Sequence, residues 1–175
     1  NRKMDQACHL YSRILQRFPQ NRLANDGLLS VHETLAMDHK KALVALYTQG
    51  KFEVVIDKAI LLTKKFTHSA EIWGILGSTF LLQGKFKEAI ESYRQALRIK
   101  PDYGEVCYNI GNALKGNGHL QEAIKYYKQA ITIMPNNANA YNNIGIILID
   151  VGNTDKAITN FKKAIAINPD FLDAY

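Results

Sequence analysis

Residues 70–103 read AEIWGILGSTFLLQGKFKEAIESYRQALRIKPDY, and the fold follows from this segment and its repetition. The next two segments have the same length: residues 104–137 read GEVCYNIGNALKGNGHLQEAIKYYKQAITIMPNN, and residues 138–171 read ANAYNNIGIILIDVGNTDKAITNFKKAIAINPDF. Self-similarity at a fixed period of a few tens of residues is the signature of a repeat protein. The residues that recur every 34 positions are Gly77, Gly111 and Gly145; Ala89, Ala123 and Ala157; Ala96, Ala130 and Ala164; and Pro101, Pro135 and Pro169.

Each unit divides into two helices. In the first, Trp73, Leu76 and Phe80 fall at i, i+3 and i+7, which is one apolar stripe of a helix. Gly84 then ends that helix, because glycine readily adopts the left-handed conformation that often follows a helix. The sequence therefore predicts a pair of antiparallel helices in each unit. A second stripe follows and ends at a proline: Ala89, Ile90, Tyr93, Ala96, Leu97, Ile99 and then Pro101.

This pattern resembles the tetratricopeptide repeat, which has Trp-Leu-Gly-Tyr in its first helix (helix A) and Ala-Phe-Ala-Pro in its second (helix B). The resemblance implies an all-α fold, a right-handed α-solenoid of antiparallel helix pairs that are stabilised by their neighbours. The helix A pattern Tyr-Asn-x-Gly-Asn is similar to the tetratricopeptide arms of O-linked N-acetylglucosamine transferases. The matching residues are Trp73, Leu76, Gly77, Phe80, Ala89, Tyr93, Ala96 and Pro101; Cys107, Ile110, Gly111, Leu114, Ala123, Tyr127, Ala130 and Pro135; and Tyr141, Ile144, Gly145, Leu148, Ala157, Phe161, Ala164 and Pro169.

The amino-terminal part departs from the pattern. One unit there has Leu43 where glycine is expected and Val55 where alanine is expected. We interpret the chain as one solenoid over residues 1–175 and as a piece of a larger protein. Its expected parts are a partial repeat with helix B only (1–20), an inserted helix (21–35), a divergent repeat (36–69), three full repeats (70–103, 104–137 and 138–171) and the start of a further repeat (172–175).

Composition and motifs argue against several classes of function. No apolar run approaches the roughly 20 residues of a membrane span, so we expect no membrane association. The two cysteines, Cys8 and Cys107, are too far apart to suggest a disulfide framework, which favours a reducing, cytoplasmic location. None of the five histidines has a second ligand at zinc-site spacing, and no nucleophile or phosphate-binding motif is present. We expect no cofactor, no metal and no enzymatic activity in this segment.

The net charge of +6 raises the question of nucleic acid. The lysines and arginines of the repeats fall mainly on helix B positions, away from the apolar stripes, and no stacking aromatics are interleaved with them. Glu71, Glu105 and Asp150 lie among the expected helix A surface positions, which argues further against RNA. We therefore interpret the basic residues as a solvated outer face: Lys85, Lys87, Arg94, Arg98, Lys100, Lys125, Lys128, Lys156, Lys162 and Lys163.

The resemblance also implies a concave face that is lined by helix A. Asn109 and Asn143 occupy the same repeat position there, and their amides offer paired donors and acceptors to an extended peptide backbone. The carboxylate clamp that some family members use on chaperone tails is not expected, since Asn139 and Asn143 stand where that clamp has lysine and arginine. The candidate groove residues are Lys41, Tyr47, Ile75, Ser78, Tyr108, Asn109, Asn112, Asn142, Asn143 and Ile146.

These observations predict a protein-protein interaction scaffold that binds an extended peptide or a partner protein on the concave helix A face. The alternative is a recognition or dimerisation arm of a larger enzyme, a glycosyl- or other transferase whose catalytic domain lies outside this chain. Apolar residues of the last helix B also suggest self-association through an exposed solenoid end. They are Ile158, Phe161, Ile165 and Ile167.

Overall fold

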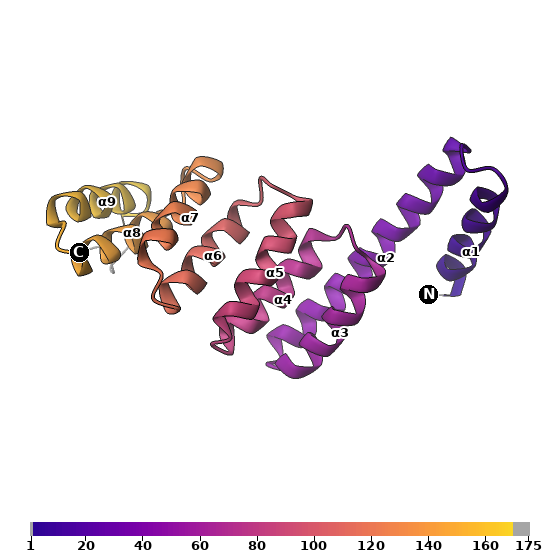
Figure 1. Cartoon of the computed structure of the whole chain (residues 1–175), viewed down its shortest axis with the longest axis horizontal. Coiled ribbons are helices and arrows are strands. Elements are labelled where there is room, and N and C mark those ends of the chain that lie inside the picture. Colours follow the sequence, from indigo (N-terminus) through magenta and orange to yellow (C-terminus); the bar gives the residue numbers. More distant parts are fainter. Residues whose placement is uncertain (1, 170–175) are drawn as a thin grey trace. The chain divides into compact units, whose positions relative to one another are not determined.

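The structure is a computed structural model that describes residues 2–169 (Figure 1). Within those residues the chain forms nine α-helices and no strand, which confirms the all-α prediction. The helices are α1 (Arg2–Arg17), α2 (Arg22–Thr48), α3 (Phe52–Lys65), α4 (Ala70–Leu82), α5 (Phe86–Ile99), α6 (Gly104–Gly116), α7 (Leu120–Ile133), α8 (Ala138–Asp150) and α9 (Thr154–Ile167). The chain divides into two compact units, Asn1–Ile72 and Trp73–Tyr175, and each is described by itself. The expected start of a further repeat lies outside the described residues.

A glycine in the left-handed region separates the helices of each pair. The φ angles are 72° at Gly50, 70° at Gly84, 80° at Gly118 and 76° at Gly152. A side chain there would meet no neighbouring atom, so the requirement for glycine comes from the backbone alone. These four residues confirm the turns that the spacing predicted.

In the second unit the recurring glycines lie where an aromatic ring of the paired helix comes closest. A Cβ atom on Gly77 would lie 2.7 Å from the ring of Tyr93, and one on Gly111 would lie 2.5 Å from the ring of Tyr127. Gly145 meets Phe161 in the same way. The rings of Tyr93 and Tyr127 are fully buried, so they have no room to move away from a side chain on helix A. The two helices can therefore approach this closely only where helix A has a glycine.

In this unit each helix A contacts the helix A of the next repeat, and helix B contacts the following helix B. Hydrogen bonds join α6 to α8, and an ion pair joins α5 to α7. The part of α4 in this unit reaches α6, since a Cβ atom on Gly74 would lie 3.7 Å from Val106. The helix A side chains of successive repeats therefore meet on one surface, which we call the helix A face.

The first unit differs from the sequence prediction. One helix, α2, continues for 27 residues through both the segment expected as a separate inserted helix (21–35) and the first helix of the divergent repeat. Its amino terminus is capped by Asn21, whose Oδ1 accepts a hydrogen bond from Ala24 N at 2.9 Å. No glycine or proline interrupts residues 28–48, so the helix has no reason to end near residue 35.

Two neighbours share this long helix. α1 packs against α2, where the ring of Tyr11 covers Gly27, and α3 packs against the carboxyl-terminal part of α2. Leu43 and Val55 stand where the regular repeats have glycine and alanine, and both are buried. The divergent residues therefore still form a core. Its buried side chains at these positions are aliphatic, whereas the regular repeats pack a glycine of one helix against an aromatic ring of the other.

None of the helices within residues 2–169 is both long enough and apolar enough to span a bilayer.

Candidate functional site

Five polar side chains of the second unit form one hydrogen-bond network, which we call the α6–α8 network. Tyr108, Asn112 and Lys115 come from α6, Tyr127 comes from α7, and Asn143 comes from α8. Tyr127 Oη donates to Asn112 Oδ1 at 2.8 Å, and Asn143 Nδ2 donates to the same oxygen at 3.2 Å. Asn143 Nδ2 also donates to Tyr108 Oη at 3.3 Å, and Lys115 Nζ donates to Asn143 Oδ1 at 3.0 Å.

The lysine fixes the direction of every bond in the network. An ammonium group has donors and no acceptor, so the Asn143 atom that it contacts must be the amide oxygen. The Asn143 nitrogen then points toward Asn112, and the Asn112 atom that it meets must in turn be an oxygen. Tyr127 donates to this same oxygen, which is consistent with the assignment.

The groups that the network leaves unused are donors. No hydrogen bond within the described residues engages Asn112 Nδ2, the O–H of Tyr108 or the remaining N–H groups of Lys115. All three side chains are half-buried and retain contact with solvent. The site therefore offers donors and a positive charge, and it suits a ligand that supplies acceptor oxygens.

Burial keeps Tyr127 in its role as a donor. Desolvation raises the pKa of its hydroxyl well above the ordinary value of 10.0, and the nearby Tyr108 raises the pKa further. The two rings lie 5.7 Å apart between centroids. Tyr127 thus stays protonated throughout the neutral range, and the orientation of Asn112 is held with it.

The structure brings some predicted groove residues together and leaves others apart. Tyr108, Asn112 and Asn143 join in the network, and Asn109 lies half-buried on the same helix α6. Ile75 and Ser78 lie on α4, where Ser78 Oγ accepts a hydrogen bond from Tyr93 at 3.0 Å. Ile146 is exposed on α8.

Three predicted residues are placed elsewhere. Asn142 does not share the exposed helix A face, because it is only 5% exposed. Its Oδ1 has no hydrogen-bond partner among the described residues. Lys41 and Tyr47 lie on α2 in the first unit. Lys41 is exposed, whereas Tyr47 is half-buried with its ring 5.7 Å from that of Phe52.

The expected ladder of two equivalent asparagines needs a correction. The Asn143 amide already bonds Asn112, Tyr108 and Lys115, so it is not a free backbone clamp, and Asn112 holds the unused amide donor instead. Sequence reasoning missed Lys115 and Tyr127. The spacing offered a signal, since Lys115 follows Asn112 by three residues on the same helix and Tyr127 is the ring that packs against helix A.

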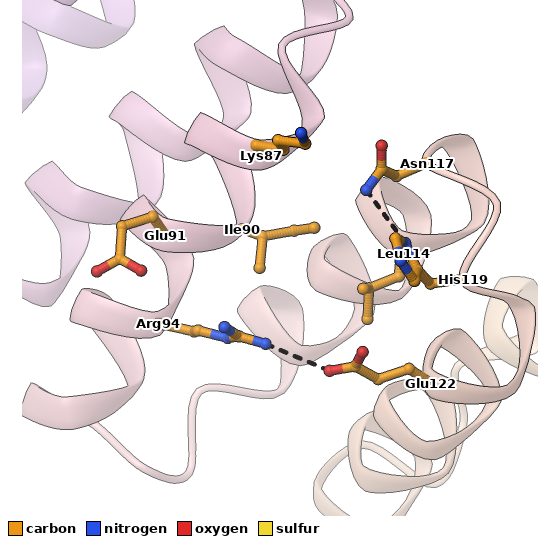
Figure 2. Close-up of a pocket in the computed structure, with 8 residues that line it drawn as sticks. All are labelled: Lys87, Ile90, Glu91, Arg94, Leu114, Asn117, His119 and Glu122. Atoms are coloured by element: carbon orange, nitrogen blue, oxygen red, sulfur yellow. Dashed lines mark hydrogen bonds and ion pairs between the residues drawn. The ribbon is translucent and has the colours of Figure 1, made fainter.

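A second feature lies between α5, α6 and α7 (Figure 2). It is a shallow depression of about 270 Å³, crossed by an ion pair in which Arg94 Nη2 lies 3.3 Å from Glu122 Oε1. Asn117 Nδ2 and His119 Nδ1 are 3.1 Å apart at its edge. The lining residues are Lys87, Ile90, Glu91, Arg94, Leu114, Asn117, His119 and Glu122.

Metal-binding chemistry has no candidate in this part of the chain. Within residues 2–169, no three histidine, cysteine, aspartate or glutamate side chains gather as a metal site would require.

Comparison with protein families gives three matches that agree with the observed repeats. A model described as TPR repeat matches residues 77–118, and a model described as tetratricopeptide repeat matches residues 104–137 and 138–171. The chain belongs to the tetratricopeptide repeat family. No curated protein sequence matches it.

Solved structures with the same fold cover most of the chain. MamA is 26% identical, with 95% of this chain and 89% of that chain covered at a TM-score of 0.69. YrrB, described as a TPR protein with an unusual peptide-binding site, is 20% identical, with 99% of this chain and 82% of that chain covered at a TM-score of 0.68. The first TPR of Spaghetti (RPAP3), bound to the HSP90 peptide SRMEEVD, is 19% identical, with 60% of this chain and 83% of that chain covered at a TM-score of 0.58. These likenesses confirm an all-α helical repeat solenoid.

Proposed function

We propose that this chain is a protein-interaction scaffold and that the helix A face of its second unit holds an extended peptide segment. Membership in the tetratricopeptide repeat family supports the general role. So do two structural neighbours, one described by its peptide-binding site and the other solved with a bound peptide.

The unused donors of the α6–α8 network carry this proposal. Asn112, Tyr108 and Lys115 offer N–H and O–H groups, and the carbonyl groups of a main chain are acceptors that every peptide has. Since Asn112 and Tyr108 are held in place by the network, little side-chain entropy is lost when they bind. The site would thus grip a backbone with limited demand on its sequence.

Apolar residues flank the donors and would receive side chains of the peptide. Ile75 and the exposed Leu82 lie on α4, and the exposed Ile146 and Ile149 lie on α8. Packed helices are about 8–10 Å apart, and an extended chain advances about 3.3 Å per residue. Because α6 lies between α4 and α8, apolar side chains roughly five to six residues apart in the peptide would reach the apolar residues of these two helices.

The test uses Asn112→Asp. The aspartate keeps an oxygen for Tyr127 and Asn143 but replaces the outward N–H donors by a second acceptor, which repels a carbonyl. Peptides would first be selected on the chain from a random displayed library, and their affinities would then be measured by calorimetry. We expect binding to weaken about tenfold, because one hydrogen bond is lost and an acceptor faces an acceptor.

The matched control is Asn136→Asp, which makes the same change in an exposed turn outside the network. Its affinity for the peptides should equal that of the unmodified chain. Equal binding by the Asn112→Asp variant would remove the network from the site, and failure of the library to yield any peptide would contradict the proposed function as a whole.

A further inference from the structure

The depression of Figure 2 recurs one repeat later, between α7, α8 and α9. The second depression is larger, at about 360 Å³. Seven of its lining residues lie 34 positions after their counterparts in the first. These are Gln121 after Lys87, Ile124 after Ile90, Lys128 after Arg94, Leu148 after Leu114, Val151 after Asn117, Asn153 after His119 and Lys156 after Glu122.

The first depression shows what this geometry can hold. Glu122 places its carboxylate at the rim, 3.3 Å from the guanidinium of Arg94 on the preceding helix B. The charges that line this depression cancel, since Lys87 and Arg94 are balanced by Glu91 and Glu122. The chain therefore neutralises the cation of this depression with a carboxylate of its own.

The second depression lacks the carboxylate. Lys128 takes the place of Arg94, and Lys156 takes the place of Glu122, so two cations line it and no acid does. Asp150 and Asp155 are near in the sequence but are not among its lining residues, and neither lysine forms an ion pair within the described residues. Two like charges on one depression without a counterion leave it complementary to an anion.

The floor of the second depression is apolar. Ile124 and Ile144 are buried beneath it, and Leu148 is half-buried. Val151, which replaces the polar Asn117, is 47% exposed at its edge. An occupant should therefore combine a negative group with an apolar neighbour.

We propose that this second depression binds an acidic side chain of a partner protein, with its carboxylate between Lys128 and Lys156 and an adjacent apolar side chain over Val151. The partner supplies in trans the group that Glu122 supplies in the preceding repeat. Because none of its lining residues belongs to the α6–α8 network, this contact is separate from peptide binding on the helix A face.

The probe is the capped peptide acetyl-Leu-Ala-Glu-Leu-Ala-amide, compared with its glutamine counterpart. Binding is followed by the methyl resonances of Ile124, Ile144, Leu148 and Val151 as peptide is added to the full chain. We expect saturable shifts in the millimolar range for the glutamate peptide and binding at least about tenfold weaker for the glutamine peptide.

Lys156→Glu recreates the ion pair of the first depression and should abolish these shifts without lowering the melting temperature. Lys162→Glu makes the same charge change at an exposed residue of α9 that does not line the depression, and it should bind the glutamate peptide as the unmodified chain does. Titration with inorganic phosphate distinguishes an acidic peptide from any anion, and the methyl groups should shift less with phosphate than with the glutamate peptide.

Four results would overturn the proposal: no saturable shift with either peptide, equal binding of the two peptides, equal loss in the two lysine variants, or phosphate shifts as large as those of the glutamate peptide. Since none of them involves the α6–α8 network, each leaves the proposed function standing.

Discussion

Tyr127 is fully buried, and its hydroxyl donates a hydrogen bond to Asn112 Oδ1 at 2.8 Å. One repeat earlier, Tyr93 donates to Ser78 at 3.0 Å across the same sequence separation. One repeat later, the corresponding positions hold Phe161 and Ile146, and neither side chain has a polar group. The two positions thus change together, because a buried hydroxyl needs an acceptor whereas a phenyl ring does not.

Tyr127→Phe should reveal this hydrogen bond through its pH dependence. At neutral pH the variant should lose about 1 kcal/mol of unfolding free energy, the typical net value of one hydrogen bond. Burial raises the pKa of Tyr127 above its ordinary value of 10.0, so above that pH the unfolded state loses this proton before the folded state does. The stability of the unmodified chain should then fall by up to about 1.4 kcal/mol per pH unit relative to the variant.

Urea unfolding of both proteins between neutral pH and pH values above 10 measures this difference. The gap in unfolding free energy should narrow as the pH rises through the alkaline range. A constant gap would mean that the hydroxyl is not buried in the folded chain.

Gly77→Ala should destabilise the chain, and Gly74→Ala, on the same helix, should not. The new Cβ atom at residue 77 would lie 2.7 Å from the buried ring of Tyr93, and overpacking of this kind costs about 1–3 kcal/mol. At residue 74 the nearest atom would be 3.7 Å away, and alanine favours a helix over glycine by about 1 kcal/mol. Thermal unfolding of the two variants provides the comparison, and equal effects would contradict the packing described for α4.

Ala36→Pro distinguishes one long helix from two shorter ones. Inside the continuous α2, proline removes a hydrogen bond and clashes with the preceding turn, at a cost of about 3 kcal/mol or more. If a second helix began at residue 36, proline at its first turn would be tolerated. Unfolding followed by circular dichroism should show that Ala36→Pro lowers the unfolding free energy by about 3 kcal/mol or more. Ala36→Gly should lower it by only about 1 kcal/mol.

Self-association remains a prediction from the apolar surface of α9. Ile158 is 44% exposed there, whereas Phe161, Ile165 and Ile167 are half-buried. We expect sedimentation velocity to show a concentration-dependent increase in mass. Ile158→Lys should weaken this association at least tenfold, since burying an isoleucine contributes about 1.5–3 kcal/mol. A single monomeric species at every concentration would contradict this prediction and would mean that the apolar surface of α9 does not bind a second copy of the chain.

The repeat and its helical pairs could be read from the amino acids because their causes are local. Gly84 and Gly118 mark turns through backbone conformation alone, and Gly77 and Gly111 mark close helix contacts within one repeat. The course of α2 differs from the prediction because the prediction there rests on the repeat period and not on a local signal. Counting back by that period places a boundary near residue 35, although nothing in the local sequence ends a helix there.

The hydrogen bonds of the candidate site depend on contacts between repeats, which no local pattern specifies. Asn143 and Asn142 are neighbours in the sequence, yet one joins the α6–α8 network and the other is buried. Lys115 gives the network its direction only because packing of α6 against α8 brings Lys115 Nζ within 3.0 Å of Asn143 Oδ1. A donor and an acceptor 28 residues apart become partners through the distance and angle between two helices, and tertiary packing sets both.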